Sequence, residues 1–391
     1  MPGFELIGKE EQDAAAEVFI KGGGVLFRHS FDALRHGSYK VKEFEREFAK
    51  KLNVKYARAV TSGTAALKVS LKALDIKPGD EVITQCFTFV ATVEAIIDAG
   101  AKPVLTEINK TLNMDPSDLK SKITDNTRAI IPVHMLGAPC QMDEITSISK
   151  AHGIPIIEDT AQALAGGYKG KKLGTIGDLG IFSFDFGKAL TTGEGGMVVT
   201  NQAPLYKKAK EYSDHGHEEN PKFPRGEDTR STYGFNYNMM ELQGAIGLAQ
   251  LKKLDYILQR QKENKRKINE GISDIPNIEF REFADEIGET GDTLVFFVED
   301  GEKAKMFNKL LMEKKMGTKI LPESIKWHFA GTWDHMLPQY EEYGGRKLMD
   351  IWENSHSILS RGIAIPIFVN MDDDRIDKII DAIHEISEKI R

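Results

Sequence analysis

The stretch that decides the fold runs from Arg128 to Asp159 and reads RAIIPVHMLGAPCQMDEITSISKAHGIPIIED. Two apolar runs, AIIPV and IPII, flank a segment in which apolar and polar residues alternate with helical spacing. A strand, a helix and a second strand in this order form a unit whose strands lie parallel in one sheet. Buried parallel strands are apolar almost throughout, because helices cover both of their faces. The stretch therefore predicts an α/β fold.

The same alternation continues on both sides of this stretch. Upstream, apolar runs at 57–60, 81–84 and 102–108 are separated by segments with helical periodicity. Downstream, the runs at 179–186 and 195–200 follow the same pattern. Strands that alternate with helices pair mostly in parallel. We therefore predict a mostly parallel central sheet that helices cover on both faces.

The length of the chain indicates more than one domain. At 391 residues it exceeds the size that a single hydrophobic core usually supports. A long helical pattern begins near Asn238 and is amphipathic at first and then strongly charged. This pattern is typical of a helix that connects two lobes. Beyond it, apolar runs and amphipathic segments alternate again. We predict a large domain over residues 1–240, a connecting helix over 241–276 and a smaller α/β domain over 277–391.

Composition excludes several classes of protein. Apolar residues make up 41% of the chain and charged residues 28%, which is the balance of a folded globular protein. The net charge of -7 argues against a nucleic-acid partner, because a polyanion requires clustered lysine and arginine. Two cysteines, Cys86 and Cys140, are too few for a disulfide framework, so we expect a reducing compartment, the cytoplasm. No apolar run reaches about 18 residues, so we expect neither a membrane span nor an export signal.

The glycine-rich stretches do not have the spacing of nucleotide-binding loops. A P-loop would need glycine at position 182 and Ser or Thr after its lysine, but residue 182 is Phe and Lys188 is followed by Ala189. No strand is followed by Gly-x-Gly-x-x-Gly, so the dinucleotide fingerprint is absent. His215 and His217 have the spacing of a metal pair, but no third ligand is identifiable, and we predict no metal site.

Three other elements carry chemistry, and the first is a turn between a strand and a helix. It consists of Thr61, Ser62, Gly63 and Thr64. Free N–H groups at the start of a helix, with a glycine for close approach and hydroxyls alongside, form a cradle for an anion such as a phosphate. The alternative is that the hydroxyls only cap an ordinary helix.

The second element is the pair Glu158 and Asp159 at the end of an apolar strand. Open α/β sheets bind ligands at this carboxyl edge of the strands. A carboxylate that emerges from a buried strand is unfavourable unless a positive group faces it. The alternative is a cap for the segment that follows Thr160.

The third element is FSFDFGKALTTGEGG, residues 182–196. The phenylalanines at 182, 184 and 186 alternate with Ser183 and Asp185, which therefore share the opposite face of the strand. Lys188 follows at the end of this strand. The alternative is that Lys188 is a solvated loop charge.

The three elements together point to one cofactor. Pyridoxal 5′-phosphate requires a lysine that forms a Schiff base, an acid that keeps the pyridine nitrogen protonated and a site for a phosphate ester. Lys188, Asp159 and the turn at Gly63 supply these groups. We therefore predict that the chain binds pyridoxal 5′-phosphate.

Several motifs resemble those of the DegT/DnrJ/EryC1/StrS family of sugar aminotransferases over nearly the whole chain. They are SGTAAL (62–67), GDEVITQCFTFVAT (79–92), PVHMLGAP (132–139), IIEDTAQA (156–163), FSFDFGKALTTGEGG (182–196) and YGFNYNMMELQGAIG (233–247). The resemblance implies a fold-type I transferase that depends on pyridoxal phosphate. It also implies a homodimer whose active sites lie at the subunit interface.

The resemblance assigns roles around the ring of the cofactor. Lys188 would form the Schiff base and act as the base in catalysis, and Asp159 would pair with the pyridine nitrogen. Gln162 would lie near the ring oxygen. Phe89 occupies the position that stacks on the ring, whereas Phe87 is the less favoured choice. Relatives with histidine in place of the lysine act as dehydratases, and because this chain keeps lysine we expect transamination.

The resemblance also assigns the phosphate site. Gly63, Thr64 and Ser183 would bind the phosphate, and Asn236 would reach it from the neighbouring subunit. The family usually has Asn-x-Arg at this last motif, but Asn238 replaces the arginine here. TQCFTF also replaces the more usual Pro-Ser before the aromatic residue. The first departure puts one positive contact across the subunit interface in question. The second puts the packing beneath the ring in question.

The N-terminal segment bears on the substrate. PGFELIGKEE and GGGVLFRHSFDALRHGSY resemble the family members that aminate the C8 aldehyde of a Kdo-type octulosonate, with L-glutamate as donor, for lipopolysaccharide biosynthesis. We therefore expect a small sugar of this type as acceptor. The alternatives are a nucleotide-linked 4-keto-6-deoxyhexose, or a non-catalytic sensor that keeps the fold. Four residues could face an anionic substrate, but for each of them we favour an exposed structural role: Arg225, Arg230, Lys326 and His328.

Overall fold

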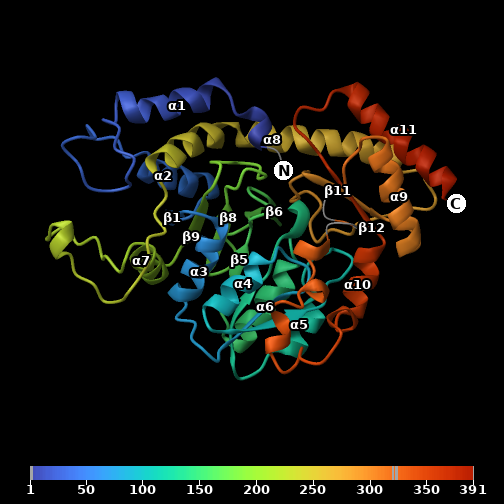
Figure 1. Ribbon diagram of the computed structural model, residues 1–391, viewed down its shortest axis with the longest axis horizontal. Coiled ribbons are helices and arrows are strands. Elements are labelled where there is room, and N and C mark those ends of the chain that lie inside the picture. The colour runs from blue at the N-terminus through green and yellow to red at the C-terminus, as the bar shows by residue number, and fades with distance from the viewer. Residues whose placement is uncertain (1–2, 319–320, 322–324, 391) are drawn as a thin grey trace.

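The computed structural model describes residues 3–318, 321 and 325–390. A central sheet occupies the middle of the larger part of the molecule, with helices around it (Figure 1). Its strands follow in the order β3 (Lys102–Thr106), β2 (Glu81–Gln85), β4 (Thr127–Ile131), β5 (Ile157–Asp159), β8 (Leu179–Ser183), β9 (Gly196–Thr200) and β1 (Tyr56–Val60).

Neighbouring strands of this sheet are parallel except at β9. β2 pairs in parallel with β3 and β4, and β5 pairs in parallel with β8. The parallel bridges Ile130–Ile156 and Val133–Asp159 join β4 to β5. β9 runs antiparallel to both of its neighbours, β8 and β1. The predicted α/β fold with a mostly parallel central sheet is confirmed.

Helices connect the strands and cover the sheet. They are α3 (Gly63–Ala73), α4 (Ala91–Asp98), α5 (Pro116–Lys122), α6 (Met142–His152) and α7 (Ala203–Tyr212). Beside β8, α2 (Lys40–Leu52) buries its predicted apolar stripe. Its Phe48 ring packs on Phe182 and Phe184 with centroid distances of 5.1 Å and 5.5 Å. This aromatic layer packs against the C-terminal end of β8, which leads to Lys188.

The long helical pattern predicted from near Asn238 forms α8 (Glu241–Ile272), which runs along the upper side of the molecule in Figure 1. α1 (Lys9–Ile20) lies along its first half. Gln250 Nε2 and Lys253 Nζ of α8 donate hydrogen bonds to the Glu11 carboxylate of α1 at 2.8 Å each. α8 therefore anchors the N-terminal part of the chain.

The C-terminal part has its own small sheet. β10 (Glu279–Phe280), β11 (Thr293–Phe297) and β12 (Gly362–Pro366) pair antiparallel. α9 (Gly301–Glu313), α11 (Asp373–Lys389) and the second half of α8 enclose a separate apolar core with this sheet.

The segment between α9 and β12 packs elsewhere. It contains the short helices η4 (Ile325–Trp327), η5 (Ala330–Thr332), η6 (Leu337–Gln339) and η7 (Leu348–Asp350), and α10 (Glu353–Ser360). Trp352 Nε1 donates to Leu105 O at 3.2 Å, and Leu105 N donates to Tyr343 Oη at 3.2 Å. The segment thus lies against β3 of the large sheet. The bounds of the three domains remain a prediction.

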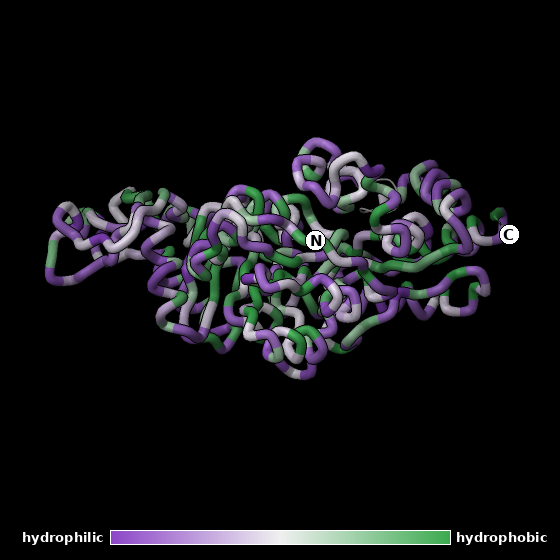
Figure 2. Tube along the Cα trace, turned by 90° about the horizontal axis from the view of Figure 1, so that it is seen from below, coloured by the Kyte–Doolittle hydropathy of each residue, from purple (hydrophilic) through white to green (hydrophobic). Residues whose placement is uncertain are grey.

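Shorter elements complete the described chain: η1 (Gly3–Leu6), η2 (Met135–Gly137), β6 (Gly167–Tyr168), β7 (Lys171–Lys172) and η3 (Arg225–Glu227). Two segments, 21–39 and 213–238, extend from one end of the molecule (Figure 1). Seen at right angles, the molecule is elongated, and apolar residues concentrate along its middle (Figure 2). Within the described residues, no helix combines the length and the apolar character that crossing a bilayer requires.

Candidate active site

The predicted site residues meet in one cavity of about 370 Å³. It lies where the ends of β5 and β8 face the start of α3, which is the ligand-binding edge of a parallel sheet. The cavity is lined by all of the predicted residues except Asn236, namely Gly63, Thr64, Phe89, Asp159, Gln162, Ser183 and Lys188. A larger groove of about 1000 Å³ between α1, α2 and α8 contains none of them and is lined largely by lysine and glutamate. Convergent polar groups make the smaller cavity the candidate site.

The turn before α3 forms one end of the cavity. Ser62 is the N-cap of α3, and its Oγ accepts a hydrogen bond from Ala65 N at 3.0 Å. The capping alternative is therefore correct for Ser62, while Gly63 and Thr64 line the cavity. A Cβ on residue 63 would lie 2.9 Å from Ser183 Cβ, so glycine is needed for this approach. The start of α3 and the Ser183 hydroxyl together suit a phosphate group.

Asp159 lines the cavity at the end of β5. Its side chain is buried, Oδ2 accepts from Thr92 Oγ1 at 2.9 Å, and Oδ1 accepts from Ala161 N at 3.1 Å. Burial raises the pKa of Asp159, while these hydrogen bonds and the charge of Lys188 act in the opposite direction. A buried carboxylate of this kind is stabilised by a cation beside it. The buried Asp159 carboxylate therefore fits a protonated pyridine nitrogen as its partner.

Glu158, the neighbour of Asp159, has a structural role. Its carboxylate accepts hydrogen bonds from the backbone N–H groups of Gly174, Ile176 and Gly177 at 2.5–2.9 Å. His134 Nδ1 accepts from Cys140 N at 3.0 Å, so its Nε2 carries the proton that it donates to Glu158 at 3.2 Å. This buried pair ties the ends of β4 and β5 together beneath the cavity.

Lys188 lies on the loop that joins β8 to β9. Its backbone N donates to Asp185 O at 2.9 Å, and Asp185 Oδ1 accepts from Gly187 N at 2.9 Å. Phe182 and Phe184 are buried, but Phe186 is 55% exposed. The expected alternation through residue 186 is therefore wrong, because β8 ends at Ser183 and the chain turns at Asp185. Ser183, Asp185 and Lys188 nevertheless all line the cavity.

An aromatic ring and an amide also line the cavity. Phe89 is 44% exposed and lines the cavity, whereas Phe87 is fully buried in the core. Gln162 Oε1 accepts from Leu136 N at 3.2 Å, which holds this side chain at the cavity wall. Sequence reasoning missed Thr92, although its position one helical turn after Thr88 in TFVAT placed it near the predicted ring site.

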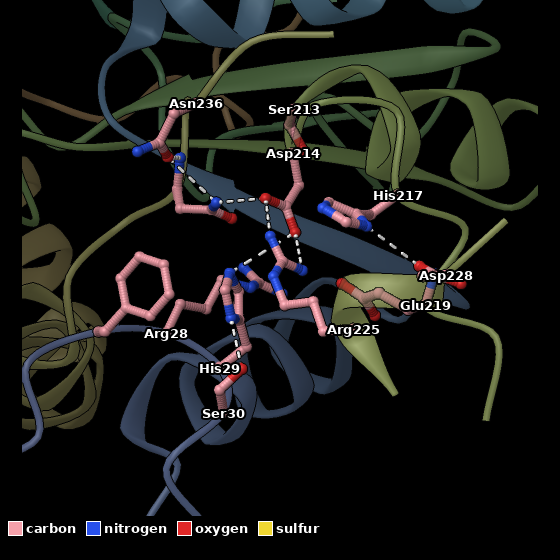
Figure 3. A network of polar contacts seen from close by, with 12 residues as sticks. Arg28, His29, Ser30, Ser213, Asp214, His217, Glu219, Arg225, Asp228 and Asn236 are labelled. Carbon is pink, nitrogen blue, oxygen red and sulfur yellow. Dashed lines mark hydrogen bonds and ion pairs between the residues drawn. The ribbon is translucent and has the colours of Figure 1, made fainter. Parts of the chain in front are cut away.

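Asn236 lies outside the cavity of its own chain, in a polar network at the base of the two protruding segments (Figure 3). The carboxylate of Asp214 accepts two hydrogen bonds from Arg225, at 2.7 Å and 2.8 Å. Asn238, which stands where the family has arginine, donates to Asp214 Oδ1 at 2.9 Å and accepts from Arg58 Nη2 at 3.1 Å. Arg58 thus brings a guanidinium group to the side chain of residue 238.

The remaining residues considered for an anionic substrate are placed differently. Arg225 is paired with Asp214, and Arg230 Nη2 lies 3.0 Å from His217 Nε2, so neither lines the cavity. Lys326 is exposed and outside the cavity lining, whereas His328 lines it. His328 is thus the one residue of these four that reaches the site within the described chain.

Comparison with known proteins shows the family to which the chain belongs. The model of the DegT/DnrJ/EryC1/StrS aminotransferase family matches residues 29–384. The spore coat polysaccharide biosynthesis protein SpsC of Bacillus subtilis (strain 168) is 36% identical and covers 97% of this chain and 95% of its own. The GDP-perosamine synthase of Escherichia coli O157:H7 is 32% identical over 89% of this chain and 90% of its own. The PLP form of Spr1654 from Streptococcus pneumoniae superposes with a TM-score of 0.82 at 25% identity, covering 98% of this chain and 97% of its own. The chain belongs to the DegT/DnrJ/EryC1/StrS aminotransferase family and is a sugar aminotransferase that depends on pyridoxal phosphate.

Proposed function

We propose that this protein moves an amino group from L-glutamate to the carbonyl carbon of a keto- or aldehydo-sugar, with Lys188 as the catalytic base. The observation that carries the proposal is that Lys188, Asp159 and the start of α3 line one cavity. These three elements come from distant parts of the sequence and supply an amine, an acid and an anion site. A sheet edge that served only as structure would not need all three.

The cofactor, when bound, supplies an aldehyde that reacts with amines and a ring that withdraws electrons from the adjacent carbon. Around it, the Asp159 carboxylate would keep the ring nitrogen protonated, and the start of α3 with Ser183 would hold the phosphate. Phe89 would cover one face of the ring, and Gln162 would lie at its edge. The Lys188 amine would take the proton from the Cα of glutamate and return a proton during formation of the aminosugar.

We propose a homodimer with shared active sites. The protruding segments carry exposed large apolar side chains, which are Phe27, Phe31, Leu34, Phe223, Tyr233 and Phe235. Exposed apolar groups in such number are typical of an interaction surface. Asn236 lies on the same segment, so a partner subunit that covered it would receive its amide. We place the reaction in the cytoplasm.

For the acceptor, we propose the C8 aldehyde of a Kdo-type octulosonate, which would place the reaction in lipopolysaccharide biosynthesis. This choice is based on the resemblance of the N-terminal segments. A second candidate is a nucleotide-linked 4-keto-6-deoxyhexose. It is supported by relatives named GDP-perosamine synthase, one of which is 42% identical over 55% of this chain. Both acceptors present a carbonyl to the same amine donor, and they differ in the diphosphate that only the second carries.

The test is turnover of the two acceptors in parallel, with L-glutamate as donor and 2-oxoglutarate as the measured product. Turnover of the octulosonate aldehyde alone supports the first acceptor, and turnover of the nucleotide-linked sugar alone replaces it with the second. Cofactor uptake without 2-oxoglutarate from either would contradict the aminotransferase proposal and indicate a sensor. Lys188→Ala is the control that should abolish product in every case.

A further inference from the structure

The first described residues of the chain lie against the loop that carries Lys188. Gly3 N donates a hydrogen bond to Lys188 O at 2.8 Å. The ring of Phe4 stacks on Phe186, with centroids 5.0 Å apart and planes at 14°. Figure 1 shows this end of the chain in the middle of the molecule beside α8. Residues that are far apart in the sequence are thus in direct contact at the catalytic loop.

The contact at Gly3 is close enough to require glycine. The residue is buried, and a Cβ there would lie 2.6 Å from Ala189 O and 2.7 Å from Lys188 O. Both neighbours are backbone atoms, so a side chain could be accommodated only if the η1 segment or the Lys188 loop moved. The two stretches of backbone therefore fit each other at this point without room for a larger residue.

The same segment is fixed at its other end to two further parts of the molecule. Glu5 Oε2 accepts from Val369 N at 2.7 Å, just beyond β12. Leu6 O accepts from Lys253 Nζ of α8 at 2.6 Å. Because these anchors lie on α8 and near the small sheet, η1 is held in place independently of the Lys188 loop. It can therefore act as a fixed support for that loop.

The Lys188 loop needs such a support. Between the end of β8 at Ser183 and the start of β9 at Gly196 the chain has no regular secondary structure and contains Gly187, Gly193 and Gly195. Hydrogen bonds within the loop, such as Phe184 N to Gly195 O at 2.8 Å, join its two ends. Because glycine-rich segments are conformationally permissive, contacts from outside the segment add to its fixation.

We propose that Gly3–Leu6 is a positioning segment that holds the Lys188 loop in the conformation in which its amine points into the cavity. The functional consequence rests on the proposed role of Lys188 in amino transfer. Phe4 and Gly3 touch neither substrate nor cofactor in this account and act through Lys188.

The experiment compares matched full-length variants. Gly3→Ala forces the close contact apart, and Gly8→Ala is its control, because a Cβ there would meet only Glu10 Oε2 at 3.7 Å. Phe4→Ala removes the stacking without forcing atoms together, and Phe19→Ala, another exposed phenylalanine, is its control. Thermal unfolding of each variant checks that the fold is retained.

The first readout is hydrogen exchange of the amides of residues 185–191 in cofactor-free protein. We expect exchange about five- to tenfold faster in Gly3→Ala and Phe4→Ala, since a lost contact of this size opens the loop locally. The controls should exchange at the wild-type rate. Unchanged exchange in both Gly3→Ala and Phe4→Ala overturns the proposal. This readout needs no turnover, so it can overturn the proposal even if the aminotransferase function fails.

The second readout is steady-state turnover with L-glutamate and the better acceptor. A displaced amine should lower kcat about tenfold to a hundredfold and leave KM within about twofold, because substrate binding groups are untouched. Faster exchange combined with unchanged kcat would show that the segment holds the loop without positioning the amine, which contradicts the proposal. Absence of turnover in the wild type would instead contradict the proposed function alone.

Discussion

Thr92→Val tests how the cavity controls the charge of Asp159. The substitution keeps the shape of the side chain and removes the hydroxyl that donates to Asp159 Oδ2 at 2.9 Å. A hydrogen bond to a charged group contributes about 1.5–3 kcal/mol, and one to a neutral group about 1 kcal/mol. We therefore expect the free energy of unfolding of cofactor-free protein to fall by about 1.5–3 kcal/mol where Asp159 is ionised. Where it is protonated, the loss should be about 1 kcal/mol.

The pH dependence follows from the direction of the Asp159 pKa. Burial raises this pKa, so the folded protein holds the proton more tightly than the unfolded chain does. Stability from this group is thus highest below its ordinary pKa and falls as pH rises toward the raised value. Loss of the Thr92 hydroxyl raises the pKa of Asp159 further. The difference between wild type and variant must therefore grow with increasing pH.

The assay is urea unfolding of cofactor-free protein at a series of pH values from the ordinary pKa of Asp159 upward, followed by the fluorescence of the buried Trp333 and Trp352. Thr106→Val is the matched control, because its buried hydroxyl has no hydrogen-bond partner in the described structure. We expect the control to be nearly neutral and independent of pH. A Thr92→Val effect that does not change across the pH series, or that is no larger than that of Thr106→Val, would refute this account of Asp159.

Three further predictions concern cofactor binding and the shared site. Gly63→Ala should weaken cofactor affinity about tenfold or more, because the added Cβ would lie 2.9 Å from Ser183 Cβ. Titration followed by the visible absorption of the cofactor measures this affinity. An unchanged affinity in the variant would count against a phosphate site at Gly63. Asp159→Asn should lower kcat/KM about tenfold to 150-fold, because a charge-assisted hydrogen bond to the cofactor is lost. Steady-state kinetics measure this, and undiminished activity would argue against a role of Asp159 at the ring nitrogen. Mixing inactive Lys188→Ala with a weakened Asn236→Ala protein should restore activity, since one site of each mixed dimer is intact; no recovery after subunit exchange would mean that Asn236 does not act across the interface.

Residue types and strand order were sufficient to bring most of the site together. Asp159 ends a predicted strand and Ser183 lies within the next one, and parallel strands place their carboxyl ends at one edge. The turn at Gly63 begins a helix at the same edge, so its approach to Ser183 follows from the topology. The convergence of these residues on one cavity could thus be predicted where it depended on the period of the strands and on the order of elements.

Contacts between distant segments were not predictable in the same way. Local periodicity does not predict that Phe4 stacks on Phe186. This contact gives the aromatic side chain of residue 186 a partner beyond the end of β8. Arg225 resembled a free charge in the sequence, but the structure pairs it with the buried Asp214. Thr92 belongs to a helix whose pattern indicates only which face is buried. Each of these cases depends on how separate elements pack, which composition and spacing do not specify.

The most direct test of the central claim is a single exposure of cofactor-loaded protein to L-glutamate in the absence of any sugar. The account predicts loss of the visible absorption of the bound cofactor, with formation of one equivalent of 2-oxoglutarate for each site, and neither change in Lys188→Ala. Persistence of that absorption in the wild type without 2-oxoglutarate would contradict the assignment of Lys188 and Asp159 to amino transfer.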